Sequence, residues 1–139
     1  MHSATLVTET ARPMSWTGRI LSGLVVAFMV FDGVIHVLTP APVVDAFAQL
    51  GVPLRLSIGI GIVELVCTAL YAVPRSSVIG ALLLTGYLGG AVATQVRAGA
   101  DWFPTIFPVL VAALLWSGLA LRDARVRSLL TIGERWPAR

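Results

Sequence analysis

The chain has 139 residues, of which 57% are hydrophobic and only 12% are charged, about half the charged fraction of an ordinary soluble domain. This composition argues against a water-soluble globule and indicates an integral membrane protein. Ten basic residues, all arginine, against seven acidic ones give a net charge of +3. The charges gather toward the two ends and form no basic stripe, so we expect no nucleic-acid partner.

The small number of cysteine and histidine residues limits which metal ions and cofactors the chain can bind. It contains one cysteine, Cys67, and two histidines, His2 and His36. These are too few for a disulfide, a four-cysteine iron–sulfur cluster, a structural zinc site or an intramembrane haem with two histidine ligands. We therefore expect no metal site and no cofactor carried by the chain itself, and we expect Cys67 to be a small core residue.

Four apolar segments follow one another along the chain, and each is long enough to cross a bilayer. At about 1.5 Å per residue, 19 or 20 helical residues cover the roughly 30 Å of hydrocarbon. The sequence therefore predicts an all-α fold, an integral membrane four-helix bundle within residues 19–121. A segment over residues 1–18 precedes it and a basic tail over 122–139 follows. The expected helices are Ile20 to Leu38, Leu54 to Val73, Val78 to Val96 and Phe103 to Leu121.

Proline and polar residues mark the connections between these helices. Pro40 and Pro42 end the first helix, and Pro74 to Ser77 predict a tight hairpin between the second and third. Between the first two helices, Val43 to Leu50 is compatible with two structures. One is a short amphipathic helix on the membrane surface, with Val43, Val44, Phe47 and Leu50 on its apolar side, and the other is an irregular loop.

Arginine placement predicts the orientation. Eight arginines lie in the N-terminal segment, the hairpin at Arg75 and the C-terminal tail, against only Arg55 and Arg97 on the opposite side. The positive-inside rule then predicts that both termini lie in the cytoplasm. We expect the protein in the cytoplasmic membrane. The tail, with Trp136 near its end, either rests on the anionic inner leaflet or is solvated.

Three ionisable side chains interrupt the apolar segments: Asp32, His36 and Glu64. Each is costly in hydrocarbon, by about 2.5 to 3.5 kcal/mol for a carboxylate on insertion scales, so each should face the bundle interior. Asp32 and His36 lie one helical turn apart on one face and can touch. Glu64 lies on a stripe with Gly61, Thr68 and Tyr71. We regard the three as candidate catalytic residues.

Further polar residues share the depth of these three in the predicted topology. Tyr87 and Gln95 mark one face of the third helix, and Arg97, Asp101 and Trp102 lie at the outer ends of the third and fourth. Together they predict a ligand-binding pocket open toward the outer face, capped by Arg97 and Asp101. The alternative is that the buried polar groups only hydrogen-bond the helices to one another.

A glycine pair, Gly86 and Gly90, forms a Gly-x-x-x-Gly pattern in the third helix. This pattern occurs at close helix contacts in membranes. It favours tight packing within one chain, and a face that pairs with a second copy of the chain is the alternative.

Several segments in order resemble the DoxX-like family of small four-helix bacterial integral membrane proteins. The resemblance covers about Trp16 to Arg127 and includes FDGVIH at Phe31 to His36, GIGIVELVCTALYAVPRSSV at Gly59 to Val78, GALLLTGYLGGAVATQVR at Gly80 to Arg97 and LLWSGLALRD at Leu114 to Asp123. It implies a bacterial inner-membrane protein. The namesake relative is a membrane subunit of a thiosulfate:quinone oxidoreductase, and other relatives are associated with membrane thiol-redox complexes.

The resemblance includes Asp32, Glu64, Tyr87 and Arg97, and it implies that these four are functional residues. The chain departs from the family pattern at two positions, with His36 where lysine is common and Gln95 where histidine is common. A role for a basic group at position 36 therefore requires a protonated His36, and a role for an imidazole at position 95 does not carry over.

Three functions remain open at this point. The first, which the resemblance favours, is a membrane subunit or accessory protein of a quinone-linked or thiol-redox system, with a quinone or a partner protein supplying the redox centre. The second is a cofactor-free acid–base enzyme, an isomerase or cyclase acting on a lipophilic substrate, in which desolvation keeps Asp32 or Glu64 protonated as a proton donor. The third is a lipid-binding or assembly protein.

Overall fold

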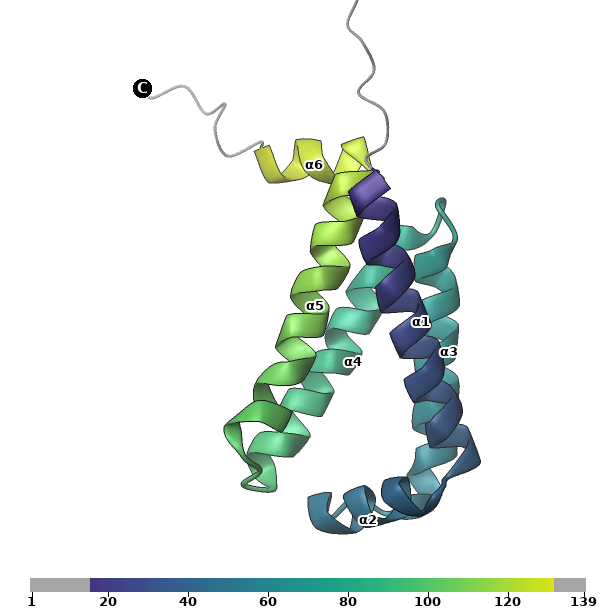
Figure 1. The fold of residues 1–139 in the computed structure, drawn as a ribbon, viewed down its shortest axis with the longest axis vertical. Helices are drawn as coiled ribbons and strands as arrows, with labels where there is room; N and C mark the ends of the chain where they lie inside the picture. Colours follow the sequence, from purple (N-terminus) through teal and green to yellow (C-terminus); the bar gives the residue numbers. More distant parts are fainter. Residues whose placement is uncertain (1–15, 132–139) are drawn as a thin grey trace, which may run out of the picture.

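The computed structural model describes residues 16–131, and within that range every regular element is a helix (Figure 1). Four helices are long and apolar enough to span a membrane, which confirms the expected all-α membrane bundle. In chain order the elements are α1 (Trp16–Leu38), α2 (Ala41–Leu50), a single 3₁₀ turn η1 (Leu54–Leu56), α3 (Ser57–Ala72), α4 (Ser77–Arg97), α5 (Trp102–Arg122) and α6 (Ala124–Thr131).

The connection after α1 resolves the open alternative in favour of a helix. Pro40 and Pro42 cannot continue α1, and a new helix, α2, begins at Ala41. Val43 and Phe47, one turn apart, are its buried residues, and it ends at Gly51, whose φ of 65° suits a residue without a side chain. α2 is therefore a short amphipathic helix with one face turned into the protein.

The four spanning helices pack as two pairs that meet at one end of the molecule. α1 packs against α3, α4 packs against α5, α3 also contacts α4, and α5 also contacts α1. Figure 1 shows the pairs converging at the end that carries α6 and diverging toward the other end, where α2 lies across the opening. α6 is the first part of the predicted tail. Trp136 and residues 1–15 lie outside the described residues.

The converging end is held together by close backbone approaches and by one buried tyrosine. A Cβ on Gly80 would lie 2.2 Å from the Tyr71 backbone nitrogen, and one on Gly118 would lie 2.8 Å from Ser22 Oγ. The fully buried Tyr71 donates its hydroxyl hydrogen to the Leu115 carbonyl oxygen at 2.9 Å, and Ser22 Oγ lies 3.0 Å from the same hydroxyl. One side chain thus links α1, α3 and α5.

The Gly86 and Gly90 pair does not pack as expected. A Cβ added at either glycine would meet nothing within 4 Å, so the interpretation of tight packing within one chain is wrong for this pair. The reason is that both glycines line an open pocket in the bundle, while the close approaches involve Gly80, Gly118, Gly33 and Gly61.

Large apolar side chains cover the outside of the bundle. More than half of the surface of Ile62 and Val66 on α3 and of Leu82 on α4 is exposed. In a membrane these side chains contact lipid, which is as apolar as they are, so their exposure costs nothing.

Candidate functional site

The close crossing of α1 and α3 creates the site. A Cβ on Gly61 would lie 2.6 Å from the Gly33 carbonyl oxygen and 2.9 Å from His36 Cβ, so only glycine allows the two backbones to approach this closely. Asp32 and His36 flank Gly33 on α1, and Glu64 follows Gly61 by one turn on α3. The glycine crossing therefore brings the three ionisable groups of the two helices together.

His36 is the centre of this cluster. Its Nδ1 lies 2.9 Å from the backbone carbonyl oxygen of Asp32, 3.6 Å from Asp32 Oδ2 and 3.8 Å from Glu64 Oε2. Because a carbonyl oxygen can only accept, Nδ1 carries the hydrogen of this bond and Nε2 of the neutral ring has a free lone pair. The ring also meets Phe47 of α2 edge to face, with 5.7 Å between the ring centroids.

Glu64 lies behind His36 and is fully buried, with 0% of its surface exposed. Tyr87 on α4 donates its hydroxyl hydrogen to Glu64 Oε2 at 2.7 Å. The other carboxyl oxygen, Oε1, has no hydrogen-bond partner among the described residues. Tyr87 thus holds one oxygen of the buried carboxyl group, and the carboxyl group of Asp32 lies close enough to interact with it.

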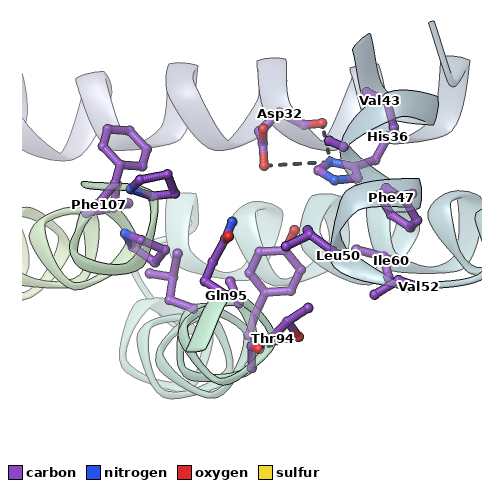
Figure 2. Close-up of a pocket in the computed structure, with 18 of the residues that line it drawn as sticks. Asp32, His36, Val43, Phe47, Leu50, Val52, Ile60, Thr94, Gln95 and Phe107 are labelled. Carbon is purple, nitrogen blue, oxygen red and sulfur yellow. Dashed lines mark hydrogen bonds and ion pairs between the residues drawn. The ribbon is translucent and has the colours of Figure 1, made fainter. Parts of the chain in front are cut away.

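A pocket of about 840 Å³ lies beside the cluster, between the diverging helix pairs. Its walls come mainly from α1, α2, α4 and α5, with Ile60 of α3, and are mostly apolar, while Asp32, His36, Tyr87 and Gln95 supply polar groups. Figure 2 shows Asp32 and His36 on one side of this space and Gln95 on another. Phe28 of α1 and Phe107 of α5 line it too and meet edge to face, with 5.5 Å between their centroids.

The structure separates the predicted ligand-binding residues into two groups. Tyr87 and Gln95 line the pocket, whereas Arg97, Asp101 and Trp102 are exposed and lie outside its lining. Arg97 is the last residue of α4, and Trp102, 76% exposed, contacts Phe103 at the start of α5. The expected cap of Arg97 and Asp101 over the cluster is not part of the pocket wall.

Two kinds of lining residue were missing from the sequence prediction. α2 contributes Val43, Phe47 and Leu50, and α4 contributes Gly86 and Gly90. The sequence shows that the 43–50 segment has an apolar side, but it does not show that this side lines the pocket. From the sequence we expected the two glycines at a close helix contact, whereas in the structure they line the pocket.

The fold and the site define a class of protein, namely a four-helix membrane protein with an apolar pocket and, beside it, a cluster of two carboxyl groups and one imidazole. The comparison with known families agrees. Residues 20–118 match the DoxX-like family, and the chain belongs to that family. No curated protein and no solved structure matches the chain.

Proposed function

We propose that this protein binds a lipophilic molecule with a small polar head within the membrane, as the membrane subunit or accessory protein of a quinone-linked or thiol-redox system. The observation that carries the proposal is the pocket of about 840 Å³, within the usual range for small-molecule sites, with its few polar groups on otherwise apolar walls. A quinone fits this description, because its two carbonyl oxygens accept hydrogen bonds and its tail is hydrocarbon.

The polar groups of the pocket wall can each make a different hydrogen bond to the polar head of such a ligand. The Gln95 side chain carries two N–H donors and a carbonyl acceptor, so it suits either a carbonyl or a hydroxyl group of the ligand. His36 Nε2 accepts a hydrogen bond when the ring is neutral and donates one when it is protonated. The Tyr87 hydroxyl hydrogen is already used by Glu64, so toward a ligand its oxygen is an acceptor.

A redox role requires a partner outside this sequence. The single cysteine, Cys67, is buried in the core, so dithiol chemistry needs thiols from another protein. A bound quinone would carry electrons through its own ring. The chain's part in this proposal is therefore to bind the quinone, orient it and exchange protons with its oxygens.

The glycines of α4 provide a sharp test of pocket occupancy. Gly90→Leu fills the pocket, whereas Gly89→Leu is a matched control, because Gly89 neighbours Gly90 in sequence but does not line the pocket, and neither position has an atom within 4 Å of an added Cβ. We expect a short-chain benzoquinone to bind the wild-type protein and Gly89→Leu equally. Gly90→Leu should weaken binding by about tenfold or more, an expected loss of at least about 1.4 kcal/mol.

Mass spectrometry of lipids and quinones that co-purify in detergent gives the independent readout. We expect a quinone in the wild-type sample and its loss from Gly90→Leu. A different lipid in the pocket, displaced by the same substitution, would favour the lipid-binding alternative. Absence of saturable benzoquinone binding to the wild-type protein would refute the quinone proposal.

The second candidate, an acid–base enzyme for a lipophilic substrate, is favoured by one specific feature. Asp32, His36 and Tyr87 at the pocket wall and Glu64 behind them form a continuous set of proton-carrying groups, and buried carboxylic acids are suited to proton donation. In that case Asp32→Asn or Glu64→Gln should abolish turnover while ligand binding persists. In the quinone case Gln95→Ala should weaken binding more than Asp32→Asn.

A further inference from the structure

We propose that Asp32, His36 and Glu64 form a binding site for one divalent first-row metal ion in the wall of the pocket. Each residue offers one ligand atom, and these atoms all lie within 4.8 Å of one another. Two adjacent turns of α1 and one turn of α3 supply them. The site is independent of the proposed function, because a metal can bind here whether or not a quinone occupies the pocket.

The spacing of the ligand atoms is close to that of a formed site. Metal–ligand distances of about 2.0 to 2.2 Å place neighbouring ligand atoms about 3.0 to 3.5 Å apart. His36 Nδ1 lies 3.6 Å from Asp32 Oδ2 and 3.8 Å from Glu64 Oε2. The two carboxylates lie within 4.8 Å of each other, so binding requires the two carboxyl groups to rotate toward the ion.

The Oε1 oxygen of Glu64 is a second observation that favours a bound cation, since it needs either a cation or a proton shared with the neighbouring Asp32 carboxyl group. Glu64 is fully buried, and Oε1 has no hydrogen-bond partner in the described part of the chain. A buried polar atom without a partner costs about 1 to 3 kcal/mol, and more when charged. A cation held by both oxygens of Glu64 would satisfy Oε1, while the Tyr87 hydroxyl on Oε2 orients the carboxylate in the way that outer hydrogen bonds orient metal ligands.

The negative charge of the two carboxylates also favours a bound cation. Two carboxyl groups face one imidazole, and no arginine within residues 16–131 lines the pocket. A divalent ion with two carboxylates and a neutral imidazole forms a set with no net charge, which hydrocarbon tolerates far better than an unpaired anion. We expected no metal site from the sequence because it contains few cysteines and histidines. The site proposed here instead takes two of its three ligands from carboxylates.

Metal binding through His36 has a small structural cost. The ion takes the place of the Nδ1 hydrogen, which now bonds to the Asp32 carbonyl oxygen at 2.9 Å, and the ring stays neutral by carrying its hydrogen on Nε2 instead. That carbonyl lies inside α1 and keeps its place in the helical hydrogen-bond pattern. Asp32 and His36 also line the pocket, so the remaining coordination positions face the space where an oxygen of a ligand head would lie.

One imidazole and two carboxylates suit zinc, manganese or iron, and Zn²⁺ is the probe for the test. The full chain, purified in detergent and treated with a chelator, is titrated with Zn²⁺, and bound metal is measured by elemental analysis. We expect about one ion per chain with the wild-type protein, and affinity lowered more than about tenfold by Glu64→Gln or Asp32→Asn. Asp45→Asn and Asp101→Asn, which change exposed carboxylates outside the cluster, should leave the affinity unchanged.

A second measurement needs no variant of the cluster. Cu²⁺ bound to the chelator-treated protein should show one nitrogen ligand by electron paramagnetic resonance, and the signal should persist in His2→Gln. Substoichiometric Zn²⁺ binding, equal affinity in Glu64→Gln and Asp101→Asn, or a Cu²⁺ spectrum without nitrogen would each overturn the metal site. The carboxyl groups of Asp32 and Glu64 would then be held together by a shared proton. Quinone binding by the chelator-treated protein is measured in parallel, so each proposal fails or stands separately.

Discussion

Tyr71 shows how one side chain can organise a membrane bundle whose surface is almost entirely apolar. Its hydroxyl joins Ser22 of α1 to the Leu115 carbonyl of α5, and Arg122 Nη2 donates to its backbone carbonyl oxygen at 2.7 Å. The Arg122 guanidinium also lies over its ring, 4.6 Å from the centroid. Apolar side chains gain little from packing together in lipid, so such polar links contribute a large share of helix association.

Tyr71→Phe should therefore destabilise the bundle measurably. The substitution keeps the ring but removes the hydroxyl from Ser22 and from the Leu115 carbonyl, at an expected cost of about 1 to 2 kcal/mol. Unfolding in mixed detergent micelles measures this free energy. Phe31→Leu, at a position 63% exposed on α1, is the control and should unfold like the wild-type protein. Equal stability of the two variants would contradict the role assigned to the hydroxyl.

Residue-scale prediction succeeded where spacing along one helix determines contact. Asp32 and His36 are four apart, and the structure brings them together. It was less complete where contact depends on how a helix is rotated. Arg97 and Gln95 are two residues apart, yet only Gln95 lines the pocket. The hydroxyl partners of Tyr71 lie 49 and 44 residues away in sequence, and no local pattern marks them.

At the scale of elements, the hairpin between α3 and α4 depends on a contact that only glycine permits. A Cβ on Gly80 would lie 2.2 Å from the Tyr71 nitrogen and 2.5 Å from its Cα. These are backbone atoms, so the helices themselves must separate to admit a methyl group. Gly89 on the same helix has nothing within 4 Å.

We accordingly expect Gly80→Ala to cost about 1 to 3 kcal/mol or more, the usual penalty of overpacking, and Gly89→Ala to be neutral or slightly stabilising, because alanine favours helix. Thermal unfolding of the two purified variants checks the difference. If Gly80→Ala matched Gly89→Ala, the close approach of α3 and α4 described here would be incorrect.

α2 covers the pocket at its wide end, and Phe47 is its main contact with the site. Phe47 is buried and meets the His36 ring. Phe47→Ala should speed dissociation of a benzoquinone from the pocket several-fold, because it removes apolar contact area next to the polar head. Val44→Ala, on the exposed side of α2, is the control. Unchanged dissociation from Phe47→Ala would show that α2 does not cover the bound ligand.

The sequence could predict the spanning helices because run length and hydropathy are local properties. It left the 43–50 segment undecided, since a ten-residue helix needs tertiary contacts to be stable, and those contacts come from the pocket that the helix covers. The glycine run at 86–90 was misassigned for the same reason. A glycine is equally suited to a close contact and to an open space, and only the relative tilt of the helices decides between them.

On the scale of the whole molecule, the bundle has a tightly packed end and a divergent end. Figure 1 shows α6 and the α3–α4 hairpin at the packed end and α2 at the divergent end. The Tyr71 contacts involve Arg122 at the packed end, whereas α2 lines the pocket together with Asp32 and His36. The orientation in the membrane therefore decides which half of the bilayer the pocket occupies. Arg75 and Arg122 belong to the packed end, and Arg55 and Arg97 to the divergent one.

Because arginine is enriched at cytoplasmic ends, we expect the packed end inside the cell and the pocket in the outer half of the membrane. Reporter fusions after Arg75 and after Arg139 should read as cytoplasmic, and one after Asp101 as external. The Asp101 fusion is the internal control, since it must always read opposite to the Arg75 fusion if α4 spans the membrane. An external reading at both Arg75 and Arg139 would invert the protein and give the pocket access to lipophilic molecules from the cytoplasmic leaflet instead.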